Sequence, residues 1–411
     1  MWGVNSEQLE RKCPPGAFFF LHVCTAWPVG IIGLALGSSL VKAGLAVQQV
    51  ALIIAASNLA FTLEFAWAPL VDSSVTRRHW YVAGAGTMCV CLAWLLIAPW
   101  NTASVPLMTT LAFASSSGAA VAAVAVKGIM AYDVPPARLG SASGFYTAGG
   151  TLAKAVGGAG TLWLLAHLSS RIPAVSANIA VAVLAGTAIL LVAPGRSHSL
   201  REVPARLGNA LKDLWALLCT RDGAKIAVLC VIPFGSGTEA GLIGAIAHEW
   251  AVSPDQLASF SVLGATTGIA GALFAGWLST RIGTWSTYVL VGWSMIAVML
   301  VFSIAPRTAN YFLGMELIYR TLASGGTVVL LGLVMTAVGK GAASTKAAGL
   351  WSLATFALVI PTFVEGLVHD RVGTQAMLLT DAGLGVAGFG VLLVASRLLK
   401  FRSDVIVECQ S

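Results

Sequence analysis

Long apolar stretches recur along almost the whole chain, and they limit its fold more than any other feature. A membrane-spanning helix needs about 20 mainly apolar residues to cross the hydrocarbon core. Windows of this kind lie at 17–36, 46–71, 80–99, 105–130, 140–166, 173–193, 224–247, 257–279, 286–305, 311–338, 347–368 and 376–396. Hydrophobic residues make up 57% of the 411 residues and charged residues 10%, against about 25% charged in a soluble domain. The sequence therefore predicts an all-α polytopic membrane protein with twelve transmembrane helices.

The distribution of basic residues predicts the orientation of these helices. If the N-terminus faces the cytoplasm, seventeen of the 24 Lys and Arg residues fall in cytoplasmic segments, and the outer loops carry only Lys42, Arg171, Arg307 and Arg371. The positive-inside rule then places both termini in the cytoplasm. Basic loops beside anionic headgroups also account for the formal net charge of +7, so we expect no nucleic-acid partner.

Cysteine and histidine spacing excludes several other classes of protein. The seven cysteines and six histidines form no pattern typical of a disulfide framework, a metal site or a catalytic centre. We therefore expect no metal, no cofactor and no enzymatic activity. The apolar run after Arg11 and Lys12 is similar to an export signal, but Val23 before Cys24 is a poor cleavage site, so we expect a retained first helix.

An internal repeat divides the chain into two halves. Pro28 and Gly30 interrupt the first window, and Pro233 and Gly235 interrupt the seventh, 205 positions later. Further matches follow in the same order at offsets of 205 to 208: Ala68–Asp72 with Gly276–Thr280, Ser116–Gly118 with Ser324–Gly326, and Ser143–Tyr146 with Ala348–Trp351. The repeat predicts two pseudo-symmetric six-helix bundles, 1–193 and 224–411, joined by an amphipathic cytoplasmic linker at 194–223. The second bundle is expected to end in a short cytoplasmic tail.

Duplicated membrane proteins of this kind suggest a transport function. Transporters with internal repeats bind substrate near the bilayer midplane, between the two halves. Interrupted helices are tolerated there because the freed backbone groups face protein or a water-filled cavity. We therefore predict that both Pro-x-Gly breaks bend their helices beside one central cavity, which is exposed alternately to each side.

The loop after the second window resembles the gate motif of the major facilitator superfamily, Gly-x-Leu-x-Asp-Arg-x-Gly-Arg-Arg. The segment APLVDSSVTRRH matches it at Ala68, Leu70, Asp72, Arg77 and Arg78. The repeat copy GWLSTRIG keeps Gly276, Leu278, Arg281 and Gly283, with Thr280 in place of the acid. The resemblance implies a cytoplasmic gate built from Asp72, Arg77, Arg78 and Arg281, with Glu64 beside it.

Two segments, Glu64–Asp72 and Ala131–Ala166, resemble a narrower branch that holds muropeptide permeases, siderophore permeases and the acetyl-coenzyme A transporter. The chain departs from this branch at Glu64, where a Lys is usual, and at Lys127–Ile129, where Thr-Gln-Asp is usual. The resemblance implies import of a bulky organic solute across the bacterial inner membrane, with a siderophore favoured over a muropeptide.

Ionisable residues inside membrane spans usually face a cavity or a partner. Lys154 lies in the fifth window among several glycines, where it either contacts substrate or pairs within a helix-packing face. Glu239 lies six residues after Pro233, where it either carries a proton or makes a structural hydrogen bond. Glu316 and Arg320 are spaced i, i+4, which favours a self-neutralised pair. Four aromatic residues are candidates for stacking on the solute, with packing as the alternative for each: Trp27, Phe234, Tyr146 and Trp351.

The fifth window also bears on the direction of transport. Drug exporters of the superfamily carry Gly-Pro where this chain has Lys154-Ala155. A buried Lys suits an anionic solute better than a cationic drug. Iron chelates are one class of such anionic solutes. The leading prediction is a monomeric proton-coupled importer whose partners are protons, lipid and a small-molecule substrate. An efflux proton antiporter is the alternative; a membrane-embedded enzyme or receptor would need residues that we do not find.

Overall fold

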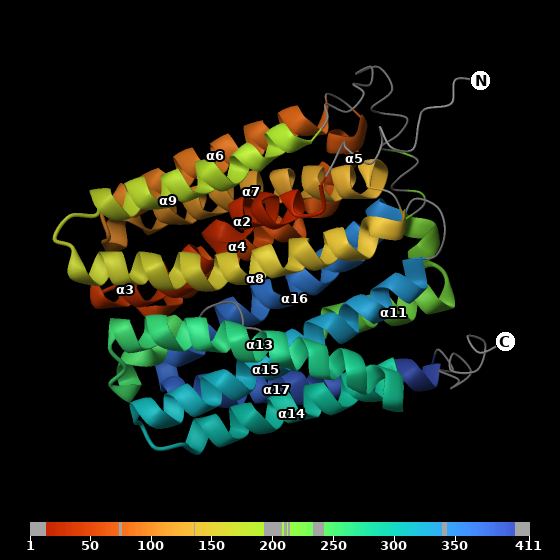
Figure 1. Ribbon diagram of the computed structural model, residues 1–411. Helices are drawn as coiled ribbons and strands as arrows, with labels where there is room; N and C mark the ends of the chain where they lie inside the picture. Colours follow the sequence, from red (N-terminus) through yellow and green to blue (C-terminus); the bar gives the residue numbers. More distant parts are fainter. Residues whose placement is uncertain are drawn as a thin grey trace, which may run out of the picture.

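The computed structural model describes residues 14–73, 76–134, 136–192, 208, 212, 214–232, 242–338 and 343–398. These residues are mainly helical, and no β-strand occurs among them (Figure 1). Two of the predicted features fall largely outside the described part of the chain. They are the linker at 194–223 and the second Pro-x-Gly, since residues 193–207 and 233–241 are not described.

The helices form two groups that lie side by side in Figure 1. The first, here called the N group, contains α2 (Ala17–Gly30), η1 (Ile31–Leu36), α3 (Gly37–Lys42), α4 (Val47–Thr62), α5 (Glu64–Ser73), α6 (Arg77–Ile97), η2 (Thr102–Ser104), α7 (Val105–Asp133), α8 (Pro136–His167), α9 (Ile172–Gly186) and η3 (Thr187–Leu191). The second, the C group, contains α11 (Arg221–Val231), α12 (Ile243–Ile246), η6 (Ala247–Trp250), α13 (Pro254–Ile282), α14 (Thr284–Ile304), α15 (Ala309–Val338), α16 (Ala343–Val372) and α17 (Thr374–Leu398).

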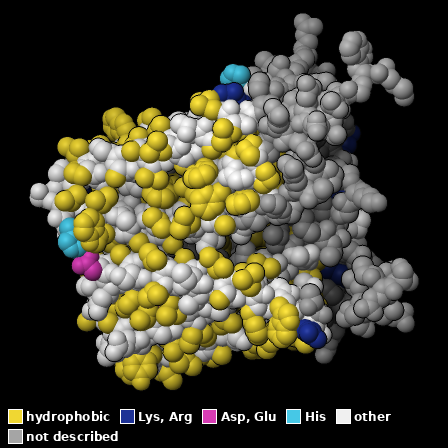
Figure 2. All heavy atoms as spheres, viewed as in Figure 1, with side chains coloured by type: hydrophobic (Ala, Val, Ile, Leu, Met, Phe, Trp, Pro, Cys, Tyr) yellow, Lys and Arg dark blue, Asp and Glu magenta, His cyan; other side chains and the backbone are white. Residues whose placement is uncertain are grey.

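Ten helices of the described part are long and apolar enough to cross a membrane. Their outward surfaces expose large apolar side chains such as Trp94, Leu273 and Ile304. Figure 2 shows apolar side chains spread over both groups, while the charged side chains visible on that face lie at the ends. The 32-residue helix α8 is long enough to be an eleventh span, and residues 224–247 belong to the remaining predicted one. The fold agrees with the predicted twelve-helix membrane protein.

The two ends of the helix array differ in their connections. Helix α2 begins and α17 ends at one end, here called the terminal face (Figure 1). The other end, the opposite face, carries the connections at 43–46, 98–101, 168–171, 251–253, 305–308 and 373. All four basic residues predicted to lie outside the cell are at or next to these connections: Lys42, Arg171, Arg307 and Arg371. That the terminal face is cytoplasmic stays a prediction.

Glycine allows α2 and α8 to touch backbone to backbone. A Cβ at Gly30 would lie 2.0 Å from the carbonyl oxygen of Lys154, and one at Gly149 would lie 2.2 Å from that of Phe19. Real Cβ atoms cannot approach so closely, so glycines of both helices set the distance between α2 and α8. The predicted packing face of the fifth span is therefore present, and it lies against the first span.

The predicted interruption of the first helix at Pro28 and Gly30 is wrong, because the chain stays helical through both residues. Pro28 lies inside α2, and η1 and α3 continue the same span as far as Lys42. Proline has no N–H to donate to the carbonyl four residues earlier. The chain nevertheless stays helical past Pro28, and a π-helical segment, η1 (Ile31–Leu36), follows three residues later. Pro233 and Gly235 lie outside the described residues.

The two groups meet along α4 with α16 and along α8 with α13. Near the opposite face, the backbone N–H of Gln48 donates to Asp370 Oδ2 at 2.8 Å, and Gly366 packs against Ala51. Nearer the terminal face, the backbone N–H of Phe65 donates to Ser352 Oγ at 3.3 Å. The interface between the two groups is therefore formed mainly by α4 and α8 of the N group and by α13 and α16 of the C group.

Candidate functional site

An ion pair joins two helices inside the N group. Lys127 Nζ of α7 lies 2.6 Å from Glu64 Oε2 of α5. The Glu64 side chain is 5% exposed and that of Lys127 is 36% exposed, so the pair lies at the boundary between protein interior and open space. The two residues at which the sequence differs from the permeases that it resembles, Glu64 and Lys127, thus neutralise each other.

A histidine missed in the sequence analysis lies next to this pair. The ring of His22 stacks on that of Tyr146, with centroids 3.6 Å apart and planes 5° from parallel. Its Nδ1 is 2.6 Å from the Tyr146 carbonyl oxygen, which can only accept a hydrogen bond. In the neutral ring Nδ1 therefore carries the hydrogen and Nε2 is left as an acceptor. Lys127 and Lys154 both lie within electrostatic range of this ring.

Gly150 makes room for the His22 ring. This glycine is the feature of the sequence from which the position of His22 could have been predicted. A Cβ at residue 150 would lie 2.3 Å from His22 Cε1, so any larger side chain would displace the imidazole. From the sequence alone, the glycines of the fifth window predict only close helix packing. A titratable residue in the first window facing a glycine of the fifth could have been proposed from the same pattern.

Lys154 belongs to a polar stripe on α8. Thr147 and Lys154 are exposed and Thr151 is half-buried, and the three are spaced four and three residues apart. Leu152 and Val156, 46% and 40% exposed, belong to the apolar stripe on the same helix. An α-helix turns about 100° per residue, so Lys154 points about 160° away from each of them. The polar stripe therefore lies on the side of α8 opposite to these exposed apolar side chains.

The C group carries its charges differently. Arg320 Nε lies 2.7 Å from Glu316 Oε1, so the two residues pair on one face of α15, as their spacing predicts. Arg320 is 32% exposed in its side chain and Glu316 3%, and the stem of Arg320 packs over Gly264 of α13. Like Lys127, the base of the pair therefore reaches the more open side.

Two buried acids of the C group were also missed. Glu365 of α16 and Asp381 of α17 are 0% and 1% exposed. Both lie inside predicted windows, so the rule that selected Glu316 would also have selected them. Glu239, the predicted proton carrier, lies outside the described residues, as does Phe234.

The remaining aromatic candidates differ in their surroundings. Trp27 is 7% exposed, packs on Gly157, and its Nε1 donates to Asn178 Oδ1 at 2.8 Å, which favours a packing role. Trp351 of α16 is half-buried and its carbonyl accepts from Thr355 Oγ1. Tyr146 is half-buried beside His22, so of these three it is the one most directly joined to the polar cluster.

The predicted gate residues lie toward the terminal face. Arg77 and Arg78 begin α6, and Arg281 lies near the end of α13 with its guanidinium 5.6 Å from the Trp277 ring. The side chain of Asp72 is outside the described set, so the grouping of these residues stays a prediction. The described partner of Glu64 is Lys127.

A second polar network lies at the opposite face of the C group. Glu249 of η6 accepts hydrogen bonds from His369 Nε2 at 2.7 Å, from Arg307 Nη1 at 3.3 Å, and from the Thr374 hydroxyl. Burial alone would raise the pKa of Glu249, but the hydrogen bonds and the nearby positive charges hold it below its ordinary value. The neighbouring Asp370 reaches across to the N group. This network therefore lies beside a contact that closes the opposite face.

The titratable side chains of the N group are mainly basic. Among the described residues, no group of three or more His, Cys, Asp or Glu side chains could hold a metal ion. The N group instead holds two lysines, Lys127 and Lys154, within electrostatic range of His22. These are groups that bind carboxylates or exchange protons.

Comparisons with known proteins agree with this fold. A family model described as Major Facilitator Superfamily matches residues 18–356. No curated protein sequence matches the chain. Several crystal structures have a similar fold at low sequence identity. A variant of the nucleoside transporter NupG is 12% identical with a TM-score of 0.74, and the match covers 93% of this chain and 98% of that one.

Two other solved structures are similar over nearly their whole length. A peptide transporter POT variant in complex with sulfate is 12% identical, with a TM-score of 0.73 and coverage of 97% of this chain and 99% of that one. A D-xylose–proton symporter is 11% identical, with a TM-score of 0.68 and coverage of 92% and 95%. At these identities the likeness concerns the fold alone.

Proposed function

Because the chain belongs to the major facilitator superfamily and is a multi-pass membrane transporter, we propose that it imports a bulky anionic organic solute together with protons. The bacterial inner membrane is its proposed location, with the terminal face in the cytoplasm and the protein acting as a monomer. A siderophore is the favoured substrate and a muropeptide the next. The D-xylose–proton symporter among the similar structures is in keeping with proton coupling.

The observation that carries this proposal is the polar stripe of α8. Lys154 is exposed on the side of α8 opposite to the exposed apolar residues Leu152 and Val156, and α8 packs against α2 of its own group and α13 of the C group. An ammonium group in a low-dielectric interior favours an anionic ligand. A ferric siderophore carries several anionic oxygens, and the aromatic ring of Tyr146 near the same site offers a face for its apolar part.

Proton coupling is proposed to involve Glu239 and His22. Glu239 stays the sequence-based candidate. His22 adds a second, because its Nε2 is left as an acceptor when Nδ1 donates to the Tyr146 carbonyl. Protonation there would place a third positive charge near Lys127 and Lys154, and an anionic solute would offset the repulsion between them. Solute and proton would thus bind together.

The first experiment is ligand-induced thermal stabilisation of the detergent-purified protein. The panel contains ferric and iron-free siderophores, anhydro-muropeptides, acetyl-coenzyme A and cationic drugs, since a ligand that binds the folded state raises its melting temperature. We expect a ferric siderophore to stabilise the wild type and Arg371→Gln, an exposed basic control, but not Lys154→Gln. Stabilisation by cationic drugs alone would reject the import proposal in favour of efflux.

Uptake into proteoliposomes separates binding from coupling. With an imposed pH gradient, Glu239→Gln and His22→Gln should each reduce accumulation of the solute at least tenfold while solute binding persists. Accumulation at the wild-type level in both variants would show that neither Glu239 nor His22 carries the coupled proton.

A further inference from the structure

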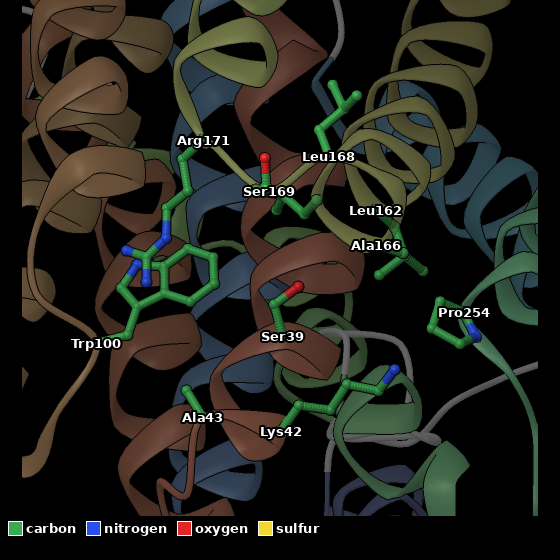
Figure 3. Close-up of a pocket in the computed structure, with 11 residues that line it drawn as sticks. Ser39, Lys42, Ala43, Trp100, Leu162, Ala166, Leu168, Ser169, Arg171 and Pro254 are labelled. Atoms are coloured by element: carbon green, nitrogen blue, oxygen red, sulfur yellow. The ribbon is translucent and has the colours of Figure 1, made fainter.

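A cavity of about 290 Å³ opens at the opposite face, away from the central polar cluster. Its walls come from the end of α3, from Trp100 after α6, from the end of α8 and the connection that follows it, and from Pro254 at the start of α13. Both helix groups therefore contribute to it. Figure 3 shows Arg171 lying against Trp100, Ser39 near the middle of the view, and Lys42 extending toward Pro254.

The charge of this cavity is unusual for its position. Only four Lys and Arg residues are predicted to lie outside the cell, and two of them, Lys42 and Arg171, line this one cavity. No acidic side chain is among its lining residues in the described part of the chain. The bias of basic residues toward the cytoplasm makes such a pair on the outer side uncommon. Binding of an anion by Lys42 and Arg171 would explain why two basic residues lie together on this side.

Arg171 is held in place before any ligand binds. Its guanidinium lies 3.6 Å from the centre of the Trp100 ring, and Nη1 donates to the carbonyl oxygen of Ala98 at 2.9 Å. A guanidinium has five N–H groups, so further donors are left for a ligand within the described surroundings. Stacking on an aromatic ring fixes the plane in which those donors point, and a planar fork of this kind matches a carboxylate or a phosphate.

Lys42 and two hydroxyl groups complete the donor set. Lys42 is exposed at the last residue of α3, and Ser39 lies almost one turn before it. Ser169 lines the same cavity from the connection after α8. Two cations with hydroxyl donors and an indole suit one anionic arm of a larger organic molecule, or a small acid. The volume is near the lower limit of about 300 Å³ for ligand pockets.

The cavity also borders a contact that joins the two groups. His167 Nε2 at the end of α8 lies 3.4 Å from Asp255 Oδ2 of α13, and Asp255 follows the lining residue Pro254 directly. Separation of α8 from α13 would remove the Pro254 wall and open the cavity toward the space between the groups. A ligand held there would therefore be released at the entrance to the central site.

We propose that this cavity is an outer anion-binding subsite, which receives a carboxylate or phosphate group before the solute reaches Lys154. This assignment rests on the proposed orientation and import function. The same chemistry could be supplied by a free solute or by the headgroup of an anionic lipid. The free solute is favoured because the cavity borders the contact between the groups rather than only the lipid-facing surface.

Direct binding tests the subsite without transport. The full chain is placed in phosphatidylcholine nanodiscs, and the probes are citrate and inorganic phosphate, measured by calorimetry. We expect citrate binding to weaken at least tenfold in Lys42→Gln and further in the double variant with Arg171→Gln. Arg371→Gln, which removes an exposed base of the same face outside the cavity, should bind citrate as the wild type does. The single variant Lys42→Gln is the safer test, because loss of Arg171 would also remove its packing on Trp100 and could disturb the fold.

The outcomes separate this proposal from the import function. Lys154→Gln should keep citrate binding at the outer site even where it abolishes solute uptake, so the two ideas can fail independently. Unchanged citrate affinity in the double variant would overturn the subsite. Loss of citrate binding in nanodiscs containing phosphatidylglycerol would overturn the assignment to a free solute, because the lipid headgroup would then be the occupant.

Discussion

The N and C groups each contain an ion pair within a membrane-spanning segment. The pair of the N group joins two helices, whereas the pair of the C group lies within one helix. In the N group Lys127 and Glu64 join α7 to α5, and the neighbouring His22 ring stacks on Tyr146 from another helix. In the C group Arg320 and Glu316 pair one turn apart within α15. The polar contacts of the N group thus depend on how its helices are packed, whereas the C-group pair forms wherever α15 is helical.

The largest expected effect comes from separating α2 and α8, the helices that hold His22 and Tyr146. Gly30→Ala would place a Cβ 2.0 Å from the Lys154 carbonyl oxygen, so the backbones must move apart. Overpacking costs about 1–3 kcal/mol or more, and we expect the upper end here because the obstacle is backbone. Thermal unfolding in detergent measures the loss. Gly160→Ala is the matched control on α8, since a Cβ at that glycine meets nothing within 4 Å. Equal stability of the two variants would contradict the close packing.

The next effect compares the two ion pairs directly. Glu64→Gln leaves Lys127 without its partner at 2.6 Å and should destabilise the protein by about 1–3 kcal/mol, less than for a fully buried pair because Lys127 is 36% exposed. Glu316→Gln should cost less, because Arg320 lies on the same helix, is 32% exposed, and can turn its long side chain toward water without moving another helix. Thermal unfolding again provides the measurement.

Exchange of the charges sharpens this comparison. Glu64→Lys combined with Lys127→Glu should recover most of the stability that Glu64→Gln loses, because the ion pair between α5 and α7 can form again. If Glu316→Gln lowers the free energy of unfolding as much as Glu64→Gln does, a pair between two helices contributes no more stability than a pair within one helix, and the comparison fails.

The smallest effect concerns Glu249 in the opposite-face network. Its pKa is held below the ordinary value of 4.5, so the ionised form contributes stability above that pH and the contribution is lost as pH falls through the lowered value. Glu249→Gln should therefore be less stable than the wild type at neutral pH, and the difference should shrink in acid. Unfolding measured from pH 7 to pH 3 tests this, and a difference that grows on acidification would show the sign to be wrong.

Hydropathy predicted most of the fold but not the detail of individual helices. The fifth window, 140–166, corresponds closely to α8, and the glycines within it identified a packing face that the structure places against α2. Pro28 was read as a break because the sequence shows the missing N–H of proline. It does not show that the chain can stay helical past the proline and continue into a π-helical segment.

The candidate site was predicted only in part because its members come from different helices. Arg320 and Glu316 could be paired from spacing, as both lie on α15. The contact between Lys127 and Glu64 and the stacking of His22 on Tyr146 depend on how helices are rotated against each other, which a single sequence does not encode in any local pattern. Glu365 and Asp381, by contrast, were open to the same rule that selected Glu316.

Helix α4 begins at Val47 after Ala46, whose methyl side chain cannot accept a hydrogen bond from the helix N-terminus. Asp370 of the other group provides this acceptor for the N–H of Gln48. If the groups separate at the opposite face, water must take over that hydrogen bond, so opening is a hydration event as well as a rotation. Solutes excluded from protein surfaces would then act on the equilibrium between closed and open forms by withdrawing water from it. The osmotic strength of the medium would become one of the variables that set how often this face opens.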